Sequence, residues 1–273
     1  MSHLPTRDNV RLYLKDWGRG RPVILIHGWP LSADMFDDLA MAIADSGMRA
    51  VAYDRRGFGR SDQPWSGYDY DTLADDLADV IAYVQSNEVT ILGFSMGGGE
   101  VARYMSRHTG AHVAQAILVG SVVPYLLKDD TNPNGVDASV FADIERNIRT
   151  DRAAFWASFF PNFYGTGSGE PLVSREVIDW SCRIAMTASL KATLACAESF
   201  STTDFRPDLA SFRVPTLFIH GASDQIVPID LTSRTAAAAV PGSRLIVYED
   251  GTHGLLASHK ERLISDVLSF LKG

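Results

Sequence analysis

A serine flanked by glycines is the first candidate for chemistry in this sequence. Residues 93–97 read Gly-Phe-Ser-Met-Gly and match the pattern G-x-S-x-G, with Ser95 at its centre. An apolar run precedes the pattern and a helix-like run follows it, which is the strand–turn–helix setting of a nucleophile elbow. Gly93 and Gly97 let strand and helix approach closely, and we expect the turn to push the Ser95 hydroxyl out into solvent. The alternative is an ordinary turn with a helix-capping serine.

A serine hydroxyl becomes a nucleophile at neutral pH only beside a base, and the base needs an orienting acid. Asp224 follows the apolar run 215–219, and His253 follows the apolar run 244–248. The chain order Ser, Asp, His is the one in which this serine pattern finds its partners. We therefore predict that Ser95, Asp224 and His253 form a catalytic triad at the carboxyl ends of parallel strands.

Other histidines and aspartates compete for these roles. His259, near the last predicted helix, is the alternative base, whereas His27 and His220 directly end strands and are interpreted as structural or lining groups. Asp230 and Asp250 are interpreted as helix-capping or surface residues.

Acyl transfer also needs donors for the negative oxygen that develops on the substrate. The backbone N–H of Met96, directly after the serine, is one predicted donor. The loop after the run 22–26 reads His-Gly-Trp-Pro. The backbone N–H of Trp29 is the second predicted donor, since Pro30 has none.

The elements that must position these residues are short apolar runs that alternate with helical patterns. Continuous apolar runs indicate strands buried on both faces of a parallel sheet. They lie at 22–26, 49–53, 89–93, 113–119, 215–219 and 244–248. Helical patterns lie at 72–84, 99–108, 232–239 and 261–271. This alternation predicts an α/β fold with a mostly parallel, doubly wound sheet.

The alternation stops between residues 124 and 207, a stretch rich in aromatic residues that has no clear buried strand. We interpret it as a mostly helical insertion over one end of the sheet. The predicted organisation is therefore a core of residues 1–123 and 208–273 with a helical cap of residues 124–207. The chain of 273 residues is 46% hydrophobic, which suits one domain with an insertion better than two equal domains.

Charge and termini restrict the partners. The net charge of −8 argues against nucleic acid and anionic membranes. The N-terminus lacks the apolar core of a signal peptide, and no apolar run is long enough to span a bilayer, so we expect a cytoplasmic protein.

Cys182 and Cys196 are expected to be reduced thiols. If one helix carried both, they would lie roughly 21 Å apart, too far for a disulfide.

Motifs for other chemistries are absent from the sequence. It contains neither G-x-x-x-x-G-K-[ST] nor G-x-G-x-x-G, and no zinc-like spacing of Cys and His, so we predict no cofactor and no metal. The basic stretch 54–61 is interpreted as a turn held by arginine–carboxylate pairs rather than as an anion site.

Taken together, these residues resemble a known family. The segments HGWPLSADMF, YDRRGFGRSDQPW, GFSMGGGEVARY, TDFRPDL, VPTLFIHGASDQIVP and the C-terminal THG are similar to the bacterial cofactor-free haloperoxidase/arylesterase (perhydrolase) group of α/β-hydrolases. The similarity extends over nearly all of the chain. It implies an α/β-hydrolase fold in which Ser95, Asp224 and His253 match the triad and Trp29 and Met96 match the oxyanion amides.

The resemblance also implies an activity. Such enzymes hydrolyse small aryl or alkyl esters through an acyl-enzyme, and in many of them hydrogen peroxide replaces water and a peracid forms, which then oxidises halide in free solution. Proline after the tryptophan, here Pro30, is associated with this perhydrolysis. A lactonase or γ-lactamase, a hydrolase of carbon–carbon bonds, and a ligand receptor with the same fold remain alternatives. Relatives often assemble, so a homo-oligomer also remains open.

The cap implied by this resemblance lines an apolar substrate pocket. Two further candidates, Ile226 and Leu255, stand next to triad residues in the sequence. The predicted substrate-binding residues are Phe155, Phe159, Phe160, Phe163, Phe200, Ile226 and Leu255.

Overall fold

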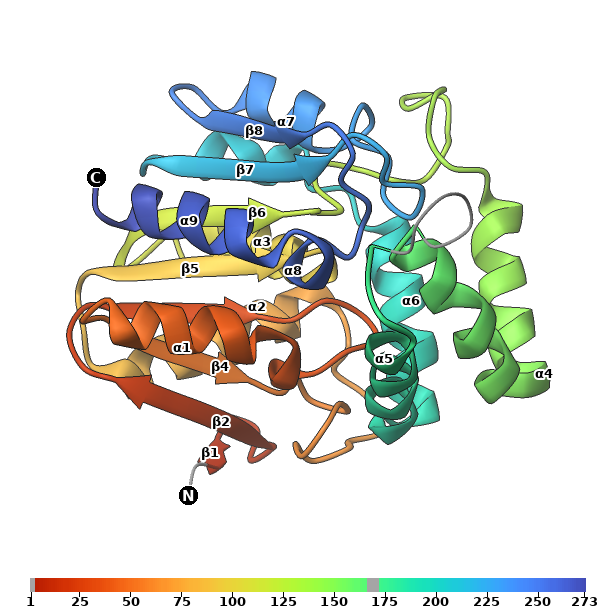
Figure 1. Ribbon diagram of the computed structural model, residues 1–273, viewed down its shortest axis with the longest axis horizontal. Helices are drawn as coiled ribbons and strands as arrows, with labels where there is room; N and C mark the ends of the chain where they lie inside the picture. Colours follow the sequence, from red (N-terminus) through yellow and green to blue (C-terminus); the bar gives the residue numbers. More distant parts are fainter. Residues whose placement is uncertain (1–2, 166–171) are drawn as a thin grey trace.

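A mixed sheet forms the centre of the molecule. The computed structural model describes residues 3–165 and 172–273, and within them the sheet has eight strands in the order β1-β2-β4-β3-β5-β6-β7-β8 (Figure 1). From β4 to β8 neighbouring strands are parallel, while β1 and β2 pair antiparallel at one edge. The strands are β1 (His3–Pro5), β2 (Arg11–Gly18), β3 (Pro22–Ile26), β4 (Arg49–Tyr53), β5 (Val89–Phe94), β6 (Val113–Val119), β7 (Thr216–Gly221) and β8 (Arg244–Tyr248).

Helices cover both faces of this sheet. Figure 1 shows α1 (Asp37–Asp45) and α9 (Lys260–Leu271) on the near face, with α2 (Tyr70–Val84) and α3 (Met96–Arg107) behind the strands. The short helices η1 (Ala33–Phe36), η2 (Pro207–Ser211), α7 (Ser233–Ala239) and α8 (Leu255–Ser258) complete these layers. Every residue of β3, β5 and β7 is buried, as expected for central strands covered on both faces.

The predicted fold class is confirmed, and each predicted strand is present within two residues of its expected ends. The N-terminal pair β1–β2 and the helix α1 were not predicted. Residues of β2 alternate between buried and exposed. The strand therefore contains no continuous apolar run that would mark it in the sequence.

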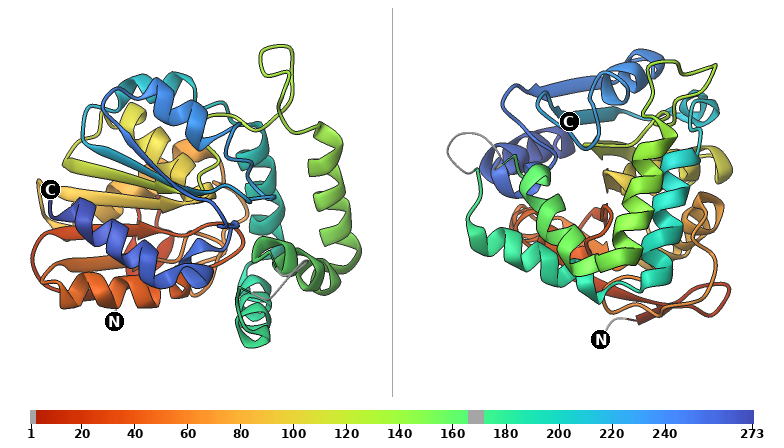
Figure 2. Two further views of the ribbon diagram at one scale, coloured as in Figure 1. Left: turned by 45° about the horizontal axis from the view of Figure 1, so that its top comes forward. Right: turned by 90° about the vertical axis from the view of Figure 1, so that its right-hand side faces the viewer.

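Three helices, called the cap helices below, stand beyond the carboxyl ends of the parallel strands: α4 (Ala138–Phe163), α5 (Arg175–Thr187) and α6 (Leu190–Thr202). Figures 1 and 2 show them as a separate group on one side of the sheet. Helix α4 is kinked where Asp151 leaves the helical conformation. Residues 166–171 of the predicted cap lie outside the described residues, and the division into core and cap stays a prediction.

The two cysteines are free and do not share a helix. Cys182 lies on α5 and Cys196 is buried on α6. The distance expected for a single helix therefore does not apply. None of the described helices combines the length and the apolar character needed to cross a membrane.

Candidate active site

Ser95 lies at the turn between β5 and α3 with an unusual backbone conformation. Its φ of 53° and ψ of −118° are sparsely populated for a residue with a side chain. The turn is tight because a Cβ atom on Gly93 would collide with the carbonyl oxygen of Gly97. A Cβ on Gly97 would likewise collide with the carbonyl oxygen of Ile26 in β3. Only glycine therefore fits at both positions.

The expectation that the turn exposes Ser95 to solvent was wrong. The residue is only 6% exposed, because the groups around it close over the elbow. Ser95 instead lines a small cavity together with His253, Trp29 and the cap residue Phe159.

His253 follows β8 and connects the serine to the acid. Its Nε2 lies 2.9 Å from the Ser95 Oγ, and its Nδ1 lies 2.6 Å from Oδ2 of Asp224. An ionised carboxylate can only accept hydrogen bonds, so Nδ1 carries the hydrogen and Nε2 accepts from the serine hydroxyl. The imidazole ring packs between Phe94 and Phe163, whose ring centres lie 5.0 and 4.8 Å away.

Asp224 is fixed in the turn after β7 by backbone donors. Its Oδ1 accepts hydrogen bonds from the N–H groups of Ile226 and Val227 at 2.9 and 2.8 Å. Burial of the carboxylate opposes ionisation, but His253 and His220 outweigh it, and the pKa of Asp224 lies below its usual range. The acid is therefore ionised at neutral pH.

A second histidine contacts the same carboxylate, and the sequence did not reveal this contact. Nε2 of His220, at the end of β7, lies 3.2 Å from Oδ2 of Asp224 and 2.9 Å from the carbonyl oxygen of Val227. Because both neighbours are acceptors, Nε2 carries the hydrogen and Nδ1 accepts from Ser233 at 2.7 Å. The spacing of four residues between His220 and Asp224 is the sequence feature that could have indicated this contact.

The competing residues have other partners. His259 pairs with Asp250 through Nε2 at 3.2 Å and contacts Ser258 through Nδ1 at 2.9 Å. Asp230 forms an exposed pair with Arg234. None of these hydrogen bonds or ion pairs involves the triad, so His253 is the histidine that the fold brings to Ser95.

The two predicted oxyanion donors lie beside the elbow. The loop after β3 packs against Ser95 so closely that a Cβ on Gly28 would lie 3.0 Å from the Ser95 Cβ. Within the described residues, the backbone N–H groups of Trp29 and Met96 donate no hydrogen bond to another protein group. Both amides are therefore free to bind a substrate oxygen.

A buried network holds this loop from below. His27 accepts a hydrogen bond at Nε2 from the backbone N–H of Arg55 at 2.9 Å, and its Nδ1 lies 2.9 Å from the carbonyl oxygen of Gly28. Arg55 forms a buried ion pair with Glu100, which also accepts from the Tyr53 hydroxyl at 2.8 Å. These contacts confirm the interpretation of the basic stretch as a turn held by arginine–carboxylate pairs.

The small space beside Ser95, called the catalytic cavity below, has a volume of about 70 Å³. Three of the predicted substrate-binding residues line it, namely Phe159, Phe200 and Ile226. Trp29 also lines the cavity, and its indole N–H donates to the carbonyl oxygen of Thr193 at 2.9 Å. The indole meets Phe200 edge-on, with ring centres 5.3 Å apart.

Four predicted substrate-binding residues lie outside the lining of this cavity. Phe155 and Phe160 pack among other aromatic rings of α4, because successive turns of that helix stack their rings on one another. Phe163 contacts the ring of His253 instead, and Leu255 is buried in the hydrophobic core. Of the two residues predicted from their place beside triad residues, Ile226 lines the cavity and Leu255 does not.

Other residues that line the cavity were not predicted. Val227 comes from the segment after β7. The others come from the loop that precedes α4 and from the first turns of that helix: Val122, Leu126, Val136, Val140, Phe141 and Ile144. The sequence feature that could have indicated this lining is the helical spacing of Val140, Phe141 and Ile144, which places them on one face of a helix. Across the described residues, no group of three or more His, Cys, Asp or Glu side chains is arranged to hold a metal ion.

Comparisons with known proteins agree with this geometry. A model of the alpha/beta hydrolase fold family matches residues 21–260. The chain is 41% identical to a non-heme chloroperoxidase of Kitasatospora aureofaciens over 97% of this chain and 98% of that protein. It is 38% identical to a bifunctional esterase/perhydrolase of Acinetobacter calcoaceticus over the full length of both. A bromoperoxidase structure from Bacillus anthracis, 40% identical, superposes with a TM-score of 0.96 over 100% of this chain and 99% of the other.

Proposed function

Because the chain belongs to the alpha/beta hydrolase fold family, we propose that it is a serine esterase that hydrolyses small carboxylic esters through an acyl-enzyme and also carries out perhydrolysis. The observation that carries the proposal is the hydrogen-bonded series Ser95–His253–Asp224, with distances of 2.9 and 2.6 Å. The relatives named as non-heme chloroperoxidase and esterase/perhydrolase support the same reaction class.

In the first step, Ser95 attacks the ester carbonyl while Nε2 of His253 takes the hydroxyl proton. The backbone N–H groups of Trp29 and Met96 stabilise the negative oxygen of the tetrahedral intermediate. His253 then gives its proton to the leaving alcohol, and the acyl group stays on the Ser95 oxygen. Asp224 holds the imidazole in the required tautomer and stabilises its positive charge.

In the second step, His253 deprotonates the molecule that attacks the acyl-enzyme. Water releases the carboxylic acid, and hydrogen peroxide releases a peracid, so both reactions use one intermediate. The largely apolar cavity supports attack by peroxide in competition with water, because it limits the number of water molecules near the acyl group. Water or peroxide and a small ester are therefore the proposed reactants.

The direct test is the variant Ser95→Ala. It should lose turnover of methyl acetate by at least roughly 10³-fold, because no acyl-enzyme can form. With hydrogen peroxide present, peracid formation should disappear in parallel. The readouts are acid release at constant pH and peracid measured by halide oxidation.

Ser181→Ala is the matched control, because Ser181 is also buried but lies on α5, where it contacts Tyr164 at 2.8 Å. Its turnover should resemble that of the wild type. Ester turnover in Ser95→Ala at the wild-type rate would contradict the whole proposal. Ester turnover by the wild type without any peracid would contradict perhydrolysis alone.

A further inference from the structure

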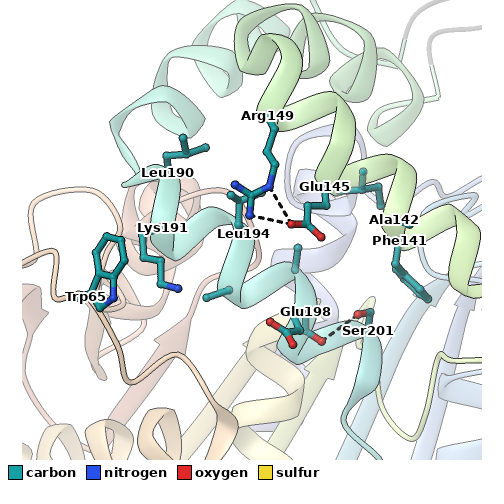
Figure 3. A pocket seen from close by; sticks show the side chains of 13 residues that line it. Trp65, Phe141, Ala142, Glu145, Arg149, Leu190, Lys191, Leu194, Glu198 and Ser201 are labelled. Atoms are coloured by element: carbon teal, nitrogen blue, oxygen red, sulfur yellow. Dashed lines mark hydrogen bonds and ion pairs between the residues drawn. The ribbon is translucent and has the colours of Figure 1, made fainter.

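A second, larger space lies on the outer side of the catalytic cavity. It is a groove of about 740 Å³ between the first half of α4 and helix α6. Figure 3 shows Glu145 and Arg149 of α4 on one side of this groove and Lys191 and Leu194 of α6 on the other. Neither the triad nor the oxyanion loop contributes to its lining.

Two side chains separate the groove from the catalytic cavity. Phe141 and Ile144, one helical turn apart on α4, line both spaces. Both side chains are only partly buried. On the α6 side, Ala197 and Ser201 line the groove while their neighbour Phe200 lines the cavity. The groove therefore adjoins the space that contains the Ser95 hydroxyl.

The catalytic cavity is too small for most esters. Holding one water molecule takes roughly 10–15 Å³ of such a cavity, so about 70 Å³ accommodates about five to seven water-sized groups. An acetyl group and the ester oxygen fill this space, and an aryl or long alkyl group on the other side of the ester does not fit. The remainder of a larger substrate must lie outside the cavity.

We propose that this groove binds the alcohol half of the ester, and that Phe141 and Ile144 determine which alcohols can reach Ser95. The proposal rests on the proposed esterase function and adds to it a binding place for the alcohol, outside the cavity that holds the acyl group. The acyl group must stay on Ser95 after the first step, whereas the alcohol must leave. A space that opens to solvent next to the cavity suits the half that leaves.

The lining of the groove combines apolar and charged side chains. Ile144, Leu194 and Ala195 contribute apolar surface that an aryl or alkyl group can contact, and Lys191 and Glu198 line the groove as well. Glu145 and Arg149 neutralise each other in an ion pair at 2.8 Å. At one end lies the Trp65 ring, which is 79% exposed and has the Lys191 ammonium group 5.0 Å from its centre.

The wall formed by α4 is held without polar contacts to the helices and strands around it. Among the described residues, no hydrogen bond or ion pair joins residues 138–150 to another helix or strand. Ile148 is buried, so apolar packing attaches this half of the helix. Side chains held only by such packing can adjust their rotamers when a substrate enters.

The test enlarges the separating side chain and varies the alcohol. Ile144→Trp should lower kcat/KM for 1-naphthyl acetate roughly tenfold more than for methyl acetate. The ratio of peracid to acid should stay as in the wild type, because both acetates give the same acetyl-enzyme. Phe141→Ala should raise kcat/KM for 1-naphthyl acetate relative to methyl acetate. It provides a second variant if Ile144→Trp does not fold.

Ile178→Trp is the matched control, because Ile178 is equally partly buried but lies on α5 beside a separate hollow with Cys182. It should leave the preference between the two acetates unchanged. An equal loss for both acetates in Ile144→Trp, or a loss that depends on acyl length from methyl acetate to methyl hexanoate, would overturn the proposal. Turnover of methyl acetate that requires Ser95 would still support the esterase function in that case.

Discussion

The carboxylate of Asp224 is shared by two imidazoles. One oxygen, Oδ2, lies near both His253 and His220, while the other accepts two backbone N–H groups. His220 does not touch Ser95 or the catalytic cavity. It connects the carboxylate to the turn that follows β7, through the carbonyl oxygen of Val227. We therefore interpret His220 as a positioning residue for the acid.

This interpretation predicts the behaviour of two variants. His220→Phe removes the N–H donor, so kcat should fall roughly tenfold or more. The acidic limb of the pH–rate profile should move to higher pH, because Asp224 then stabilises a positively charged imidazole more strongly. His220→Gln keeps a donor and should restore part of both effects. A fall in kcat without any movement of the pH profile would show that His220 only supports folding.

Ser95, Asp224 and His253 meet because each lies in the segment that follows a strand: directly after β5, three residues after the end of β7 and five residues after the end of β8. Parallel strands place their carboxyl ends at one edge of the sheet, so three residues far apart in sequence were predicted to meet. The sequence could not reveal how the cap closes over them. The kink at Asp151 and the face that α4 turns inward depend on packing between distant segments, and a helix rich in aromatic residues has several candidate inward faces. This explains why Phe159 lines the catalytic cavity and Phe155 does not.

The close approach of β5 and α3 gives a prediction about the elbow. In Gly93→Ala, the new Cβ meets the backbone oxygen of Gly97, which cannot rotate away. The free energy of unfolding should fall by about 2 kcal/mol or more, together with esterase activity. Gly47→Ala is the contrasting variant, because Gly47 has a φ of 87° but open space around its Cα.

In Gly47→Ala the free energy of unfolding should fall by about 1–2 kcal/mol, because alanine is strained in the left-handed conformation. Its kcat/KM should stay unchanged. Urea denaturation and ester turnover measured on both variants separate the two causes. Equal activities in Gly93→Ala and Gly47→Ala would contradict the role assigned to the tight turn.

Across the whole fold, the site depends on charges buried beneath it. The loop with Trp29 lies above His27, and His27 lies against the buried pair of Arg55 and Glu100. Replacing either member of such a pair alone leaves an uncompensated charge in the interior. Folding stability and the placement of the Trp29 amide are thus linked through one network.

This network makes stability depend on pH through His27. Burial, and then the charge of Arg55, lower the pKa of His27 well below its ordinary value of 6.5. The native state therefore keeps this imidazole neutral, whereas the unfolded chain binds a proton near pH 6.5. Below that pH the unfolded state binds more protons, so the free energy of unfolding should fall as the pH falls, by up to ~1.4 kcal/mol per pH unit from this residue.

The variant His27→Asn removes that contribution, while every other titrating group is retained. Its free energy of unfolding is lower than that of the wild type near neutral pH, because a buried hydrogen-bonded group is changed, but it should fall less steeply between about pH 6.5 and pH 5. Urea denaturation at several pH values measures both slopes. Parallel slopes for His27→Asn and the wild type would mean that the folded protein protonates His27 as readily as the unfolded chain does. The hydrogen bond from Arg55 N–H to Nε2 excludes that, because a protonated Nε2 has no lone pair with which to accept it.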